Sequence, residues 1–347
     1  MIIITNKKGD KMGLSGMNIS NLKDGDIGLY NGDGWVSKMI RLLDGTEMNH
    51  ASIFVGNNEV IEAEGGKNRI SKNTIEESIS GSNWIKVYRL IERPDDMNPV
   101  VDKANWYFEQ GNRYGYEQIL LLAMLALIRK PKKGKIFKYL AKIVFERAAA
   151  VLLKLTEGGK EVLICSELVY RSYNEAHDGI NDPYSLKLTN LNTIKGMVSL
   201  PENVHTESLY ALFSVPAAKN LSDNKFVGTS YNNVKLMADD MELDVLSDMD
   251  DELKQLLPLL EDDELMAKGV PEVSIEELEG AFQVFASQLH RQTNLSQLDQ
   301  VESINDATYF REKSMTFKSL NEVIADFVTP GDLYKADTLK YVGKIKH

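Results

Sequence analysis

The chain has 347 residues, 43% of them hydrophobic and 26% charged, a composition typical of globular proteins rather than fibrous or wholly disordered chains. Its formal net charge of -11 argues against nonspecific binding to duplex nucleic acid, so no nucleic-acid partner is expected. The single cysteine excludes an intrachain disulfide and cysteine-based zinc or iron–sulfur sites, and the scattered histidines show no ligand spacing. No metal or other cofactor is therefore expected.

The N-terminus and the apolar runs predict neither an export signal nor a membrane-spanning helix. The first residues, MIIITNKKGDKMG, place an apolar run before the lysines, which reverses the order found in a secretory signal. The longest apolar run, residues 119–128, falls well short of the ~20 residues that a transmembrane helix needs. The sequence thus predicts a protein that is cytoplasmic as synthesised.

The first part of the chain predicts a lead-in, a strand and a helix. Residues 1–21 are rich in Gly, Asn and Lys and are expected to be flexible. Residues 22–30 are typical of a turn followed by a short strand. Apolar side chains at helical intervals in residues 35–43 predict a helix that ends at Asp44 and Gly45.

A β-hairpin is predicted next, from two β-type runs at residues 50–56 and 59–63. In a hairpin centred on Gly56, His50 lies directly opposite Glu62, and opposed residues share one face of the sheet. Opposed side chains are close enough for a carboxylate to hold an imidazole in one tautomer, as the third member of a catalytic triad does. The hairpin therefore predicts a His50–Glu62 pair.

The register of this hairpin has alternatives that the sequence leaves open. A two-residue turn at residues 57–58 would pair Glu62 with Ile53 and would place His50 on the other face. A slip of two residues would instead make Glu64 the orienting acid.

Helices dominate the middle of the chain. Residues 85–91 predict one more strand, residues 102–110 a helix, and residues 111–116 a turn. Residues 117–155 predict two long apolar helices separated by a basic loop, KPKKG. Because each is amphipathic or apolar, we expect either a helical hairpin packed on the core or contact with an anionic membrane surface.

Cys165 stands where a short apolar run becomes the predicted amphipathic helix of residues 165–176. The first turn of a helix presents unpaired N–H groups and a positive potential, which stabilise a thiolate. A neighbouring His50 would add a base. The alternative is that Cys165 is a small buried apolar residue.

The order of five short motifs resembles the permuted papain-like NlpC-type cysteine hydrolases, particularly their YaeF/YiiX amidase branch. The resemblance covers residues 20–180 discontinuously. The motifs are Gly25-Asp26 before the first strand, His50 in HASIFVG, Glu62 in VIEA, the Gly-x-x-Tyr motif that ends at Tyr114, and Cys165 in CSELV.

This resemblance implies an α+β fold, a circularly permuted papain-like antiparallel sheet with the catalytic cysteine at a helix N-terminus. It makes Cys165 the nucleophile, His50 the general base and Glu62 the orienting acid of a reaction through a thioester. Asp26 and Tyr114 are implied only as motif positions. Tyr30 is a candidate contact to the oxyanion or the substrate, with a half-buried strand tyrosine as the alternative.

The same resemblance suggests how the chain is divided. After the lead-in, a catalytic domain spans residues 22–204 and carries a basic helical insertion near residues 117–158. An acidic, mainly helical domain at residues 205–325 is expected to be inserted, because residues 326–347 resemble the segment that follows the cysteine helix in this branch. These last residues predict a turn and a strand that returns to the catalytic domain.

The sequence leaves three interpretations of the function and its substrate. The resemblance implies cleavage of an amide in a peptide or peptidoglycan-like substrate. The fold is also similar to that of lecithin:retinol acyltransferase-like enzymes, so the second reading is an acyltransferase or phospholipase acting on an acyl-lipid, with peripheral membrane contact through residues 119–155. The third is a catalytically silent interaction module.

Overall fold

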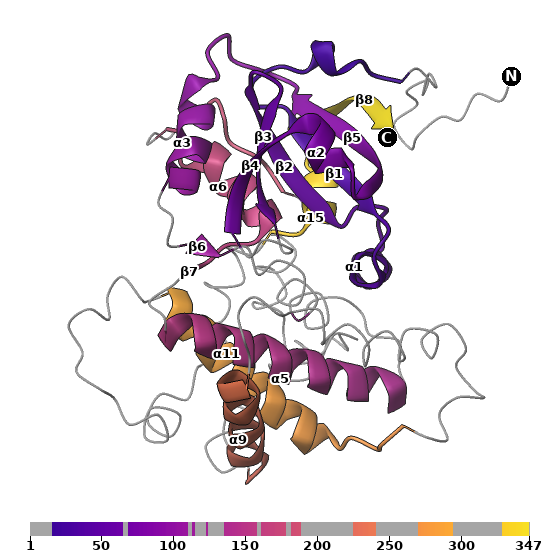
Figure 1. Ribbon diagram of the computed structural model, residues 1–347, viewed down its shortest axis with the longest axis vertical. Helices are drawn as coiled ribbons and strands as arrows, with labels where there is room; N and C mark the ends of the chain where they lie inside the picture. The colour runs from indigo at the N-terminus through magenta and orange to yellow at the C-terminus, as the bar shows by residue number, and fades with distance from the viewer. Residues whose placement is uncertain are drawn as a thin grey trace, which may run out of the picture.

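A six-stranded antiparallel sheet forms the centre of the fold (Figure 1). Its strand order is β4-β3-β2-β1-β5-β8, and helices accompany it, so the predicted α+β class is confirmed. The strands are β1 (Ile27–Gly32), β2 (His50–Gly56), β3 (Glu59–Glu64), β4 (Arg69–Thr74), β5 (Ser82–Leu90) and β8 (Leu339–Lys346). The computed structural model describes residues 16–64, 69–109, 113–114, 123, 135–157, 161–177, 182–188, 225–240, 270–293 and 328–346.

Apolar residues alternate along the strands and fill two separate clusters, one on each face of the sheet. The α6 face packs against helices α1 (Trp35–Asp44), α3 (Asn98–Glu109) and α6 (Cys165–Asn174). The α2 face packs against the short helix α2 (Ile75–Ile79). The strand residues of the α6 face include Ile27, Leu29, Ala51, Ile53 and Ile61. Those of the α2 face include Tyr30, Phe54, Val60, Ile85 and Val87.

The hairpin of β2 and β3 has the register that is slipped by two residues from the predicted one. Asn57 and Asn58 form a two-residue turn, with positive φ angles of 50° and 64°. A bulge between Phe54 and Gly56 then shifts the pairing by one residue, so Glu62 lies opposite Ser52.

The predicted direct opposition of His50 and Glu62 is therefore wrong, as is the pairing of Glu62 with Ile53. The bulge nevertheless leaves Glu62 on the face of His50, because His50 and Ser52 are two residues apart on one strand. Extending this register would put Glu64 opposite His50. The side chain of Glu64 lies outside the described part of the chain.

Residues that precede β1 contact the C-terminal strand β8. A single 3-10 turn, η1 (Ile19–Asn21), follows Met17, whose N–H donates to the carbonyl of Lys344 in β8 at 2.7 Å. A Cβ atom on Gly343 would come within 2.7 Å of the Met17 side chain, so glycine permits this close approach. Residues 16 and 17 contact β8, while residues 1–15 lie outside the described part and the flexible lead-in stays a prediction.

β8 joins the sheet from the far end of the chain. It pairs antiparallel with β5, with Ile85 opposite Ile345 and Leu90 opposite Leu339. Before it, the predicted turn is a one-turn helix, α15 (Pro330–Tyr334), because Thr329 and Asp332 form a capping box. The boundaries of the proposed domains stay predictions.

Three helices pack together apart from the sheet: α5 (Lys135–Glu157), α9 (Lys225–Asp240) and α11 (Ile275–Thr293) (Figure 1). Phe145 of α5 stacks on Phe285 of α11 with ring centroids 5.6 Å apart. Most apolar side chains of α5 are buried in this contact, which favours the packed arrangement over membrane contact for this helix. No helix in the described ranges is long and apolar enough to span a membrane. Apart from Ala123, residues 115–134 lie outside those ranges.

Candidate functional site

The buried carboxylate of Glu62 is the centre of a polar cluster on the α2 face. Its Oε2 atom lies 2.7 Å from Nε2 of His50, and Ser78 of α2 donates to the same oxygen at 2.9 Å. Asn73 of β4 donates to Oε1 at 2.8 Å. Glu62 is only 3% exposed, so these three partners replace the water that would otherwise solvate it.

Tyr30 and Ser52 extend the cluster to β1 and β2. The hydroxyl of Tyr30 lies 2.7 Å from Oγ of Ser52 and 2.7 Å from Oγ of Ser78. Ser78 uses its one hydroxyl hydrogen on Glu62, so Ser78 must accept from Tyr30. Tyr30 must then accept from Ser52. The hydrogen bonds run in one direction, from Ser52 through Tyr30 and Ser78 to Glu62.

The charge states of these groups agree with that direction. Burial alone would raise the pKa of Glu62, but the hydrogen bond and charge of His50, with Asn73 and Ser78, lower it below its usual value. Burial raises the pKa of Tyr30, and the charge of Glu62 raises it further. Glu62 is therefore an ionised acceptor and Tyr30 a neutral donor at pH 7.

This arrangement determines the tautomer of His50. An ionised carboxylate only accepts hydrogen bonds, so Nε2 of His50 must carry a hydrogen and donate it to Glu62. In the neutral ring Nδ1 then holds the lone pair and can act as a base. The edge-to-face contact between His50 and Tyr30, with centroids 4.9 Å apart, also restricts the imidazole plane.

Cys165 is the first residue of α6 and has no exposed surface. Its place along the sheet follows from the other end of the helix, where Tyr173 donates to the carbonyl of Gly25. Gly25 in turn donates to the carbonyl of Phe54 at 2.8 Å. The C-terminal end of α6 thus lies beside the Phe54 end of β2.

The lengths of helix and strand put Cys165 level with His50. From Tyr173 back to Cys165 the helix rises about 12 Å, and from Phe54 back to His50 the strand rises about 13 Å. Because α6 packs on β2 and β3, both residues lie at the same end of the sheet. They approach that end from different sides, since Cys165 belongs to the α6 face and His50 pairs with Tyr30 of the α2 face.

Of the predicted site residues, the structure brings His50, Glu62 and Tyr30 into contact. Tyr30 is 1% exposed and its hydroxyl is engaged by two serines, which favours positioning of Glu62 over contact with a substrate. The backbone of Tyr114 pairs with Val162, three residues before Cys165. The side chain of Tyr114 lies outside the described part.

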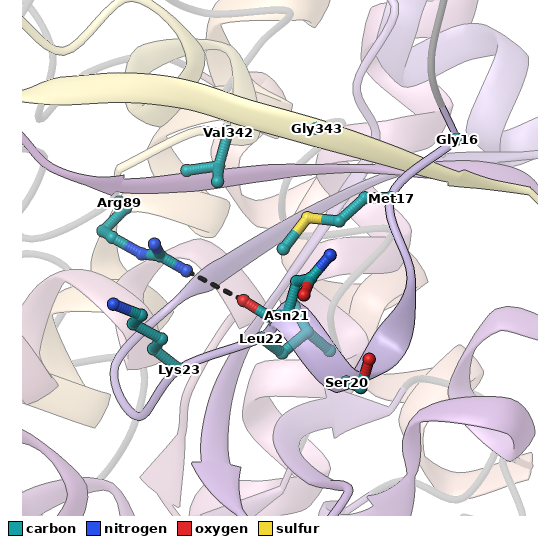
Figure 2. Close-up of a pocket in the computed structure, with 9 residues that line it drawn as sticks. All are labelled: Gly16, Met17, Ser20, Asn21, Leu22, Lys23, Arg89, Val342 and Gly343. Carbon is teal, nitrogen blue, oxygen red and sulfur yellow. Dashed lines mark hydrogen bonds between the residues drawn. The ribbon is translucent and has the colours of Figure 1, made fainter.

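Asp26 is remote from His50 and has a structural role. Its carboxylate, 1% exposed, accepts two hydrogen bonds from Arg89 at 2.6 Å each and one from the backbone of Lys23. This ion pair joins β1 to β5. It adjoins a pocket of about 450 Å³ between η1 and β8, where Figure 2 shows the guanidinium of Arg89 donating to the carbonyl of Asn21. The pocket therefore lies at the end of β1 opposite His50.

Ser78, Asn73 and Ser52 belong to the cluster but were not predicted from the sequence. One signal for Ser78 was present, because Thr74 and Glu77 form a capping box that begins α2 and so fixes the place of Ser78 in the helix. Asn73 and Ser52 carry no such signal, since their roles depend on which strands become neighbours.

The comparisons and the site chemistry give no further assignment. No cluster of three or more potential metal-ligating His, Cys, Asp or Glu side chains occurs within the described ranges. No family model matches this chain, and no curated protein matches it.

Proposed function

We propose that this protein is a cysteine hydrolase that cleaves an amide bond of a peptide or peptidoglycan-like substrate, with Cys165, His50 and Glu62 as its catalytic triad. The observation that carries the proposal is the 2.7 Å contact between Nε2 of His50 and the carboxylate of Glu62, which is buried and accepts three hydrogen bonds. It leaves Nδ1 as the basic nitrogen of the neutral ring. Cys165 begins a helix at the same end of β2.

The order of the strand and the helix along the chain supports the proposal. The strand with His50 precedes the helix with Cys165, as in a circularly permuted papain-like enzyme, and α6 runs in the same direction as β2. Cys165 belongs to the α6 face and His50 to the α2 face, so Sγ and Nδ1 would have to meet around the start of β2.

The reaction begins when Nδ1 of His50 takes the thiol proton and the thiolate of Cys165 attacks the carbonyl carbon of the amide. Glu62 stabilises the imidazolium that forms. Backbone N–H groups in the first turn of α6 have no carbonyl partner within the helix and can donate to the oxyanion. The amine leaves with the proton from His50, and water then hydrolyses the thioester.

The lipid alternative gains no support from α5. That alternative relied on apolar helices that could lie on a membrane, and the apolar side chains of residues 137–155 pack against α9 and α11 instead. An amide substrate is therefore the better proposal.

Alkylation of Cys165 across a range of pH tests the triad directly. Cys165 is the only cysteine, so the mass gained with iodoacetamide reports this thiol alone. We expect the wild-type thiol to react with an apparent pKa well below the ~8.5 of ordinary cysteine, and His50→Ala to return it toward that value. His177→Ala, an exposed histidine after α6, is the matched control and should change nothing.

Two results would overturn the proposal. One is a Cys165 pKa near that of ordinary cysteine that His50→Ala leaves unchanged. The other is activity against lipids alone in a screen of N-acyl peptides, peptidoglycan fragments and phospholipids, with Cys165→Ala as the inactive reference. Because Cys165 is buried, the absolute alkylation rate also reports how often the thiol becomes accessible.

A further inference from the structure

A cluster of lysines and aromatic rings, here called the lysine cluster, covers the outer part of the α6 face on β5 and β8. Lys344 places its ammonium 4.1 Å from the ring centroid of Trp84. Lys86 lies 4.9 Å from the same ring and 5.6 Å from the ring of Tyr334 in α15. Lys346, opposite Trp84 across the strand pair, extends the cluster.

Positive charge in the lysine cluster exceeds negative charge. Glu47 bonds to Lys86 at 2.8 Å, and its side chain is 67% exposed. Burial lowers the pKa of Lys344, and the neighbouring charges of Lys86 and Lys346 lower it further. Like charges are thus held together beside two rings, in a chain whose net charge is negative. An anion placed here would relieve that repulsion.

The cluster lies at the same end of the sheet as the proposed active site. Ile345, Ile85, Tyr30 and His50 form one row across β8, β5, β1 and β2. With neighbouring strands about 4.8 Å apart, the row spans about 14 Å from β8 to β2. About four residues of an extended peptide cover that distance, at about 3.3 Å each. Along β5 and β8 the lysines are the neighbours of Ile85 and Ile345, and their side chains lie on the α6 face.

We propose that the lysine cluster binds a carboxylate of an acidic peptide substrate, about four residues from the bond that Cys165 attacks. This inference rests on the proposed hydrolase function. The cluster presents charge and partly exposed rings, and a peptide carboxylate satisfies both the ammonium groups and the polar edges of the rings. Lysines on an edge strand also discourage sheet aggregation, but that role predicts no ligand.

Binding is measured on the full chain with Cys165→Ala, so that the result does not depend on catalysis. The probe is a rhodamine-labelled, C-terminally amidated tetraglutamate peptide, and the tetraglutamine peptide is its neutral match. Fluorescence anisotropy at 50 mM salt should give a Kd about tenfold lower for tetraglutamate. Higher salt should remove this difference because it screens exposed charges.

Single variants locate the site. Lys344→Gln and Lys346→Gln should each weaken tetraglutamate binding about fivefold, and Glu47→Gln should strengthen it by removing the competing carboxylate. Lys340→Gln is the matched control, since Lys340 is exposed on the same strand but pairs with Arg89 on the other face. It should leave the Kd unchanged.

Three outcomes would overturn the inference. They are equal affinity for the two peptides, equal effects of Lys340→Gln and Lys344→Gln, and binding of phosphatidylglycerol vesicles in place of tetraglutamate. Failure of the hydrolase proposal appears separately, in the alkylation of Cys165, because peptide binding here requires no reaction.

Discussion

Oε2 of Glu62 lies 2.7 Å from Nε2 of His50 although Glu62 is paired with Ser52, two residues further along β2. The contact is diagonal across the hairpin, at a Cβ separation that long side chains can still bridge. A single bulged residue makes it possible. Without the bulge, the Asn57–Asn58 turn would move Glu62 to the other face of the sheet.

The first prediction concerns the tautomer of His50. Nitrogen-15 NMR of the Cys165→Ala protein should show hydrogen on Nε2 and none on Nδ1 when the ring is neutral, because ionised Glu62 can only accept. Glu62→Leu should give a mixture of both tautomers. The His50→Gln spectrum assigns the signals among the five histidines. A neutral ring that carries its hydrogen on Nδ1 would contradict the role given to Glu62.

The second prediction concerns Ser78, which links Tyr30 to Glu62. Ser78→Ala removes one donor from a buried carboxylate and one acceptor from Tyr30, so the free energy of unfolding should fall by about 1–3 kcal/mol. Ser80→Ala is the matched control, because Ser80 is exposed at the end of the same helix and should change it by less than about 0.5 kcal/mol. Urea denaturation measures both. Equal losses would rule out a special role for Ser78.

The third prediction concerns acid stability. The pKa of Glu62 is lower in the folded protein than its usual value of 4.5. Its ionisation therefore stabilises the fold fully above pH 4.5, and that contribution is lost as the pH falls through the lowered folded-state value. Wild type should lose stability below pH 4.5 more steeply than Glu62→Gln, which has no proton to bind. Parallel curves for the two proteins from pH 7 to pH 3 would refute this expectation.

The fourth prediction separates Asp26 from the reaction. Asp26→Ala leaves the mostly buried guanidinium of Arg89 without its carboxylate, so unfolding should become easier by about 3 kcal/mol. Glu47→Ala removes an ion pair whose carboxylate is exposed and should cost less, about 1 kcal/mol. In folded Asp26→Ala protein, alkylation of Cys165 should keep its wild-type pH dependence. A shifted dependence would assign Asp26 a part in the site.

The sequence by itself determined the local elements. Apolar and β-branched residues favour strands at β2 and β3, and the helix predicted at residues 35–43 is α1, which Gly45 ends with a positive φ of 65°. The twelve-residue spacing of His50 and Glu62 and the helix start at Cys165 are also local features. These depend on neighbours in the chain, so periodicity and turn chemistry suffice to predict them.

Tertiary structure decided the register of the hairpin, the contacts of Ser78 and Asn73 with Glu62, and the pairing of β8. Gly56 accepts a φ of 90° beside Asp24, a residue of another segment, and this bulge chooses the face of Glu62. Ser78 and Asn73 reach Glu62 only after β4 pairs with β3 and α2 packs on the sheet. β8 pairs with β5, from which it is separated by about 250 residues of sequence. The free energies of such contacts depend on which surfaces meet, and that information is absent from any local window of sequence.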